Sequence, residues 1–133
     1  PVYCPALTDA EIGNFLYYYK QKPDAPDGVG IEISADYDHL IENGLLADQT
    51  GLLAIGGGVP KHHAIMTNLF RGGADYAVYI STGMEGDGSL SGAPPSEAVS
   101  WGKIKNEAQR NYTQIEAEAT LVVPLLVAGA FRN

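Results

Sequence analysis

Apolar and polar positions alternate in blocks that predict helices and strands in turn. In the first block, apolar residues at helical spacing predict a helix from Glu11 to about Lys20, which Thr8 or Asp9 can cap. A segment rich in proline, aspartate and glycine at 22–28 breaks this helix. Two further elements are expected after the break, a short strand at 30–34 and a helix at 36–47.

The clearest pattern is a strand, a glycine turn, a helix and a second strand. The apolar run Gly51–Ile55 is typical of a parallel strand that is buried on both faces. Three glycines, Gly56–Gly58, follow it directly, and a helix is expected from about Lys61 to Arg71. A run rich in β-forming residues, Ala74–Ile80, comes next. This order predicts a βαβ unit and therefore an α/β fold with a parallel sheet.

The last part of the chain begins with a long loop, Ser81–Pro95, that is rich in glycine, serine and proline. Ser96 can cap a helix from Glu97 to about Glu107. Residues 109–114 are interpreted as a connector, and the apolar segment Glu118–Phe131 as a buried final helix.

Composition adds the size and the charge of the domain. A chain of 133 residues is about one domain. Its net charge of −8 argues against binding to a phosphate backbone. The charge would suit a cationic partner, although on charge alone an acidic surface that simply aids solubility is the preferred explanation. Cys4 is the only cysteine and cannot form an intrachain disulfide, and no apolar run is long enough to cross a bilayer, so we expect a cytoplasmic protein.

The glycine turn and the residues after it allow more than one interpretation. A triple glycine between a strand and a helix can bind nucleotide phosphates, but plain structural turns have the same pattern. Lys61 is not in the frame of a phosphate-binding loop. His62 and His63 point about 100° apart on a helix, and no second cluster of ligands appears, so no metal site is predicted. A single histidine could still act as an acid or base, or simply be exposed.

Acidic residues and the only tryptophan follow the second strand, at the edge of the sheet where α/β proteins bind ligands. Glu85 and Asp87 lie in the loop, and Glu97 and Trp101 share one face of the predicted helix. Carboxylates beside an aromatic ring can bind a polyamine through ion pairs and cation–π contacts. A solvated acidic loop over a structural tryptophan fits the pattern equally well.

Lys103 follows Trp101 in the motif SEAVSWGKIK. On a continuous helix the two side chains would point in nearly opposite directions. Burial can lower the pKa of a lysine by several units, which yields the neutral amine that forms imines. For an arbitrary lysine, a surface charge is the more common role.

Taken together, these motifs resemble the deoxyhypusine synthase family over nearly the whole chain. The similarity is carried by six segments, namely PVYCPALTD (1–9), TGLLAIGGGVPKHH (50–63), GGADYAVYIST (72–82), DGSLSGA (87–93), EAVSWGKI (97–104) and ATLVVPLLVA (119–128). The resemblance implies a Rossmann-like parallel sheet flanked by helices, of which this chain is the C-terminal part. It also implies NAD-dependent transfer of the aminobutyl group of spermidine, through an imine on an enzyme lysine, to one lysine of translation initiation factor five-A.

The resemblance also implies roles for individual residues. Lys103 would form the intermediate in a closed pocket, and His62 would contact spermidine beside the reacting carbon. The other residues implied to bind the substrate are Glu97, Trp101, Gly88, Ser89, Leu90 and Asn14. The residues implied to contact NAD are Asp9, Gly57, Thr82, Gly83, Asp87, Glu118 and Ala119.

Five positions depart from the family's animal-type pattern, and two of them, Met84 and Gly86, replace bulkier or polar residues of the loop. Asn14 and Leu90 stand where those enzymes have aspartates that bind the polyamine, although leucine is similar to the archaeal pattern, and Glu118 replaces a cofactor-side aspartate. These departures leave the polyamine and its acceptor open. A homospermidine synthase-type enzyme that uses putrescine is one alternative, and a non-catalytic subunit that activates a paralogue is another.

Chains of this family are much longer, and their N-terminal half supplies further strands and ligand contacts. Without them, the strand at 51–55 would leave an apolar sheet edge, which soluble proteins avoid. We therefore expect residues 1–133 to be completed by a second polypeptide that carries the N-terminal half, within a tetramer-like assembly.

Overall fold

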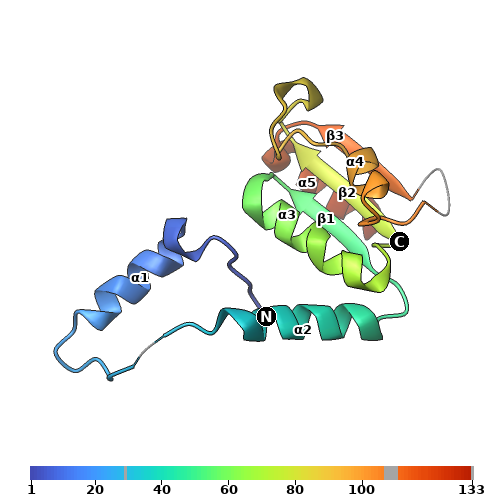
Figure 1. The fold of residues 1–133 in the computed structure, drawn as a ribbon. Helices are drawn as coiled ribbons and strands as arrows, with labels where there is room; N and C mark the ends of the chain where they lie inside the picture. The colour runs from blue at the N-terminus through green and yellow to red at the C-terminus, as the bar shows by residue number, and fades with distance from the viewer. Residues whose placement is uncertain (29, 107–110, 133) are drawn as a thin grey trace.

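The computed structural model describes residues 1–28, 30–106 and 111–132. Its centre is a three-stranded sheet in the order β1-β2-β3. The strands are β1 (Gly51–Ile55), β2 (Tyr76–Ser81) and β3 (Tyr112–Glu116), and both pairs are parallel. Figure 1 shows helices on both faces of this sheet. The predicted α/β class with a parallel sheet is confirmed.

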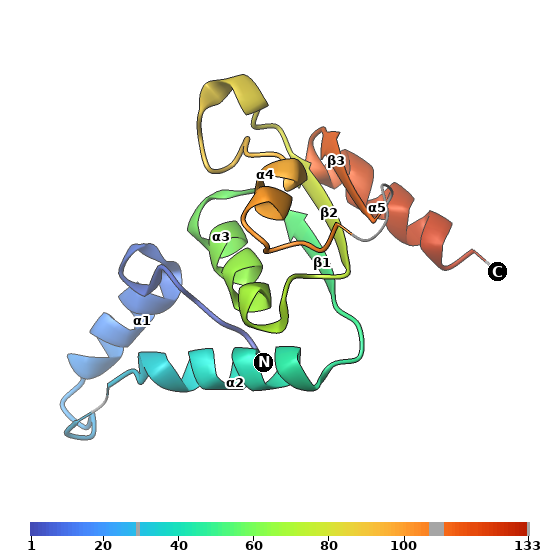
Figure 2. The ribbon, with the colours of Figure 1, turned by 45° about the vertical axis from the view of Figure 1, so that its right-hand side comes forward.

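The predicted βαβ unit is present. Between β1 and β2 the chain forms α3 (Gly58–Thr67), which η2 (Asn68–Arg71) extends by a 3₁₀ turn. Figures 1 and 2 show α3 and the short α4 (Pro95–Ser100) on one face of the sheet and α5 (Ala119–Ala130) on the other. Since the strands are parallel, their carboxyl ends lie together at one edge of the sheet.

The hydrophobic core lies between the sheet and the two helices α3 and α4, which cover one of its faces. Ala77 and Tyr79 of the central strand pack there against Ile65, Ala98 and Ile104. In contrast, β1 is an edge strand among the described residues, and the expectation that it is buried on both faces is wrong for this chain. Its side chains at 53 and 55 are 57% and 51% exposed.

The N-terminal part contains η1 (Leu7–Asp9), α1 (Glu11–Lys20) and α2 (Ile33–Leu46). The helix at 11–20 is confirmed, but its N-cap is Ala10, without a side-chain cap, so the capping role expected of Thr8 or Asp9 is wrong. The strand expected at 30–34 is also wrong. The Glu32 side chain accepts a hydrogen bond from Ser34 N at 2.9 Å and starts α2 there.

The C-terminal part differs from the sequence prediction at three points. The helix expected to reach Glu107, which lies outside the described residues, ends at Ser100. The expected connector at 109–114 begins outside the described residues, and its remainder starts β3. α5 is largely exposed instead of buried, with Leu125 at 73%. None of the helices in the described part of the chain has the length and apolar character needed to cross a membrane.

Candidate active site

The loop between β2 and α4 folds over the N-terminus of α3 and encloses a small cavity. Its lining includes four residues singled out by the sequence, His62, Glu97, Trp101 and Lys103. They come from α3, from α4 and from the segment just after α4. The fold therefore brings together two motifs that are far apart in the sequence.

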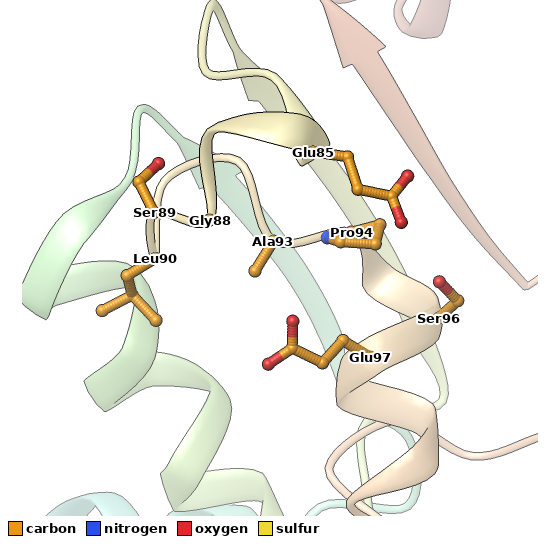
Figure 3. A pocket seen from close by; sticks show the side chains of 8 residues that line it. All are labelled: Glu85, Gly88, Ser89, Leu90, Ala93, Pro94, Ser96 and Glu97. Atoms are coloured by element: carbon orange, nitrogen blue, oxygen red, sulfur yellow. The ribbon is translucent and has the colours of Figure 1, made fainter.

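A larger open cleft of about 630 Å³ lies beside this cavity and is lined by the same loop and by α4. Gly88, Ser89 and Leu90 line it together with Glu85 and Glu97. Figure 3 shows the Glu97 carboxylate pointing from α4 into the space beneath the loop, on the side of the Leu90 side chain. Because Leu90 and Glu97 also line the small cavity, the two spaces share a wall.

The position of Lys103 depends on an abrupt end to α4. Gly102 has φ +70°, a left-handed conformation that favours glycine, and it turns the chain back toward the sheet. Lys103 N donates to Ala98 O at 2.9 Å, and Lys103 O accepts from Ala74 N at 3.0 Å. The half-buried Lys103 side chain then places Nζ 5.7 Å from the centre of the Trp101 ring. The expectation that these two side chains point in opposite directions is wrong, because the helix ends before them.

The two adjacent histidine side chains lie in different surroundings. His62 lines the cavity that contains Lys103. His63 packs instead against Tyr37 of α2, with ring centroids 5.2 Å apart. Only His62 is thus placed to exchange a proton with a molecule in the cavity.

The cavity is open to solvent on one side. His62 and Glu97 are exposed, and 66% of the Trp101 surface is accessible. The closed pocket expected from the sequence is therefore not formed by this chain alone.

Lys61, which stands outside the frame of a phosphate-binding loop, is a further residue of the cavity that the sequence does not single out. It is 6% exposed, and its Nζ donates to the carbonyl oxygens of Leu90, Ser91 and Ala93 at 3.2, 3.3 and 2.7 Å. Burial lowers the pKa of Lys61, and the negative charge of Glu97 partly opposes this effect. No sequence signal separates such a lysine from an exposed one.

Tyr79 also lines the cavity and was not singled out by the sequence. It is 2% exposed, and its hydroxyl has no hydrogen-bond partner among the described residues. Burial, and to a lesser extent the charge of Glu97, raises the pKa of Tyr79 to about 12. The hydroxyl therefore stays protonated at neutral pH.

Five of the residues implied to contact a cofactor lie at the carboxyl edge of the sheet. They follow β1, β2 and β3 directly and are Gly57, Thr82, Gly83, Glu118 and Ala119. The helices α3 and α5 begin at this edge, so their N-termini can attract phosphate groups. This arrangement fits a dinucleotide.

Close packing and local hydrogen bonds also explain why some of these positions carry glycine or a carboxylate. A Cβ at Gly57 would approach Ser91 Cα and Cβ to 2.5 Å, so the loop over α3 requires glycine there. Asp87 accepts a hydrogen bond from Met84 N at 3.2 Å, and Glu118 accepts one from Thr120 N at 2.9 Å at the start of α5. Both carboxylates therefore stabilise local turns in addition to any contact with a ligand.

Asp9 and Asn14 are not brought to the cavity. Asp9 ends η1, against which α1 packs, and Figures 1 and 2 show α1 apart from the sheet. Asn14 donates to the Glu11 carboxylate at 3.0 Å and lines a separate groove with Leu16 and Tyr17. Neither residue contributes to the wall that carries Lys103.

Comparison with known proteins identifies relatives along the whole chain. The sequence model of the family described as deoxyhypusine synthase matches residues 1–130. A probable deoxyhypusine synthase of Halobacterium salinarum is 81% identical over 134 residues, which cover 100% of this chain and 40% of that protein. The probable deoxyhypusine synthase of Pyrococcus abyssi is 52% identical over 127 residues, covering 96% of this chain and 37% of that protein.

A deoxyhypusine synthase of Caenorhabditis elegans is 50% identical over 131 residues, which cover 98% of this chain and 34% of that protein. The chain thus spans 34 to 40% of the length of these three relatives. With 130 of its residues matched by the family model, the chain belongs to the deoxyhypusine synthase family.

Proposed function

We propose that this chain is the lysine-bearing part of a deoxyhypusine synthase. In this function, the aminobutyl group of spermidine is transferred through Lys103 to a lysine of translation initiation factor five-A. One observation carries the proposal, which is the convergence of Lys103, His62 and Glu97 on a single cavity walled by Trp101. The names of the relatives supply the substrate class.

The charges around the cavity suit a polyamine. Glu97 lines both the cavity and the neighbouring cleft, and Glu85 lines the cleft, so carboxylates are available to two separated ammonium groups. The Trp101 ring offers an aromatic surface to the aliphatic chain and a cation–π contact to an amine. The net charge of −8 would also favour the approach of a cation.

Two lysines line this cavity, and their hydrogen bonds distinguish them. The Lys61 ammonium has three N–H groups, and three carbonyl oxygens accept from it. Lys103 is therefore the better candidate nucleophile, because its neutral amine can add to the oxidised aminobutyl carbon, release the diaminopropane part of spermidine as the leaving amine, and remain joined through a carbon–nitrogen double bond. His62 is the group in the cavity that can accept and return the protons of these steps.

NAD is the cofactor proposed for this site. When bound, it supplies the oxidant that the polyamine carbon requires. The residues that would hold it are Gly57, Thr82, Gly83, Asp87, Glu118 and Ala119, with Asp9 joining them only in a larger assembly. The two helix N-termini at the carboxyl edge favour its phosphates.

The rest of the enzyme is the proposed partner of this chain. We infer that a second polypeptide, carrying the remainder of the family's domain, covers the exposed edge of β1 and closes the cavity, within a tetramer-like assembly. The open side of the cavity and the exposed side chains of β1 support this inference.

The test is covalent trapping in the assembled enzyme. Enzyme incubated with NAD and labelled spermidine, then reduced with borohydride, should carry the label on the peptide that contains Lys103. In Lys103→Ala the label and the modification of the protein substrate should fall by at least about a thousandfold. The exposed Lys22 provides a matched control, since Lys22→Ala should retain both.

Three outcomes would contradict the proposal. Full modification of the protein substrate by Lys103→Ala would show that Lys103 is not the nucleophile. Label on the partner polypeptide instead of this chain would indicate a non-catalytic subunit. Transfer to putrescine but not to the translation factor would keep the lysine chemistry and replace the acceptor.

A further inference from the structure

Lys61 is the most deeply buried charged side chain near the candidate site. It lies in α3, one turn before Ile65 of the hydrophobic core, and only 6% of it is exposed. A buried ammonium is costly unless hydrogen-bond acceptors surround it. The acceptors of Lys61 show what it does in the fold.

All three acceptors belong to one short piece of the loop. Nζ donates to Leu90 O at 3.2 Å, to Ser91 O at 3.3 Å and to Ala93 O at 2.7 Å. This segment lies outside the helices and strands, so those carbonyls have no partner in a regular ladder. The ammonium therefore satisfies three oxygens that point toward one position.

The other side of the ammonium is also occupied. Nζ lies 4.5 Å from the centre of the Tyr79 ring, within the range of a cation–π contact. The charge of Glu97 adds attraction, while burial lowers the pKa of Lys61. Held between the central strand and the loop, the lysine connects the core of the sheet to the wall of the cavity.

The segment that Lys61 holds is also the segment that shapes the site. Leu90 and Ala93 line both the small cavity and the larger cleft. Ser91 also packs closely on Gly57, where even a methyl group would collide with it. The loop is thus fixed on the start of α3 both by this close packing and by the ammonium of Lys61.

We propose that Lys61 is a positioning residue that fixes residues 90–93, and through them the width of the polyamine cavity, without bonding to the substrate. The inference rests on the proposed function, because it takes this cavity to be the polyamine site. It assigns the two lysines of the cavity to separate tasks, with Lys103 for the chemistry and Lys61 for the shape.

The test compares Lys61→Met and Lys61→Arg with Lys22→Met, a control on an exposed lysine, in the assembled enzyme. Methionine keeps the length of the side chain but removes the charge and the donors. Arginine keeps the charge, but no single nitrogen of its planar guanidinium carries three N–H groups, so it cannot donate to all three oxygens from one point. Each variant is examined by hydrogen exchange of its backbone amides and by the kinetics of spermidine use.

In Lys61→Met, the amides of residues 88–93 should exchange at least about tenfold faster, while those of β1 and β2 keep their rates. The KM for spermidine should rise about tenfold or more, because several hydrogen bonds to a charged group are lost. At saturating spermidine, the borohydride-trapped adduct on Lys103 should remain. Lys61→Arg should show the same changes to a smaller extent, and Lys22→Met none.

Unchanged exchange in the loop of Lys61→Met would overturn the proposal. Exchange that becomes faster in β2 by the same factor as in the loop would also overturn it, because it would show that Lys61 only stabilises the fold. Loss of the Lys103 adduct with an unchanged KM would also overturn it, by making Lys61 part of the chemistry. Should Lys61→Met fail to fold, Lys61→Arg provides the same readouts. The exchange measurement needs no substrate and therefore tests the positioning role of Lys61 separately from the proposed function. If the loop exchanged faster in Lys61→Met as expected but the unaltered enzyme never carried label on Lys103, the proposed function would be refuted while the positioning of residues 90–93 by Lys61 would stand.

Discussion

At the scale of single residues, Asp75 joins three parts of the chain beside the candidate site. One of its carboxylate oxygens accepts hydrogen bonds from Arg71 and Thr50 N, both at 2.7 Å, and the other accepts from Lys105 at 2.6 Å. Arg71 also donates to Gly44 O in α2. The next residue toward the N-terminus, Ala74, pairs with the backbone of Lys103. The cluster therefore supports the segment that carries Lys103, the proposed nucleophile.

These partners hold the pKa of Asp75 well below its usual range, chiefly through the hydrogen bond from Lys105 and then through Thr50 N and Arg71. In the unfolded chain the pKa returns to about 3.9. As the pH falls below about 4, the unfolded state therefore binds the proton first. The stabilisation is complete above that pH and is lost as the pH falls through the folded pKa.

Asp75→Asn should therefore lower the free energy of unfolding by about 3 kcal/mol at pH 7, because Arg71 and Lys105 lose the charge that compensates theirs. The variant should also lose less stability between pH 5 and pH 2 than the unaltered protein. Denaturant unfolding at several pH values measures both effects. Asp38→Asn, at an exposed position of α2, is the control. Parallel pH curves for the unaltered protein and Asp75→Asn would show that Asp75 does not provide the acid dependence.

At the scale of elements, the sequence predicted those parts whose local pattern agrees with their packing. The βαβ unit could be predicted because an apolar run, three glycines, a helical segment and a second β-rich run follow one another within residues 51–80. β3 was missed because its pattern is half-exposed and polar, and its place is set by pairing with β2. The strand expected at 30–34 failed because a single side-chain cap at Glu32 starts a helix there.

In the candidate site too, some features could be predicted from the local sequence and others depend on packing. Lys103, His62, Glu97 and Trp101 could be singled out from the sequence, since they stand in the motifs that carry the family resemblance. The orientation of Lys103 could not, because it depends on where α4 ends and on the left-handed Gly102. The role of Lys61 could not be predicted from the sequence either, since it arises from three carbonyl groups about thirty residues away.

Gly57 provides a test of how α3 and its covering loop fit together. Its φ is −161°, so alanine causes no backbone strain there, but the added Cβ would collide with Ser91. Gly57→Ala should lower the free energy of unfolding by about 1–3 kcal/mol and displace the loop. Gly51→Ala is the matched control, because a Cβ added at Gly51 would meet no atom within 4 Å, and it should stay within about 0.5 kcal/mol. Denaturant unfolding of both variants measures the difference, and equal effects would show that the close approach of the loop does not matter.

At the scale of the whole molecule, large apolar side chains face solvent in several places. Leu53 of β1 is 57% exposed, Phe15 of α1 70%, and Leu121 and Leu125 of α5 70% and 73%. An unpaired strand edge with apolar side chains is a site for pairing with another segment. The chain also spans only 34 to 40% of the length of its relatives. Both facts are explained if the rest of the family's domain packs on these surfaces and closes the cavity.

The edge of β1 is where this idea can be tested most directly. Leu53→Lys places a charge in the surface that the remainder of the domain would bury, so it should weaken association with that polypeptide at least about tenfold, which corresponds to about 1.4 kcal/mol. Gln21→Lys adds the same charge at an exposed polar position and should leave association unchanged. Native mass spectrometry of the coexpressed polypeptides measures the fraction assembled. If the unaltered chain remained a monomer in that mixture and unfolded in one cooperative step, the exposed apolar surfaces would need another explanation, because a domain that is stable alone does not require a partner along β1.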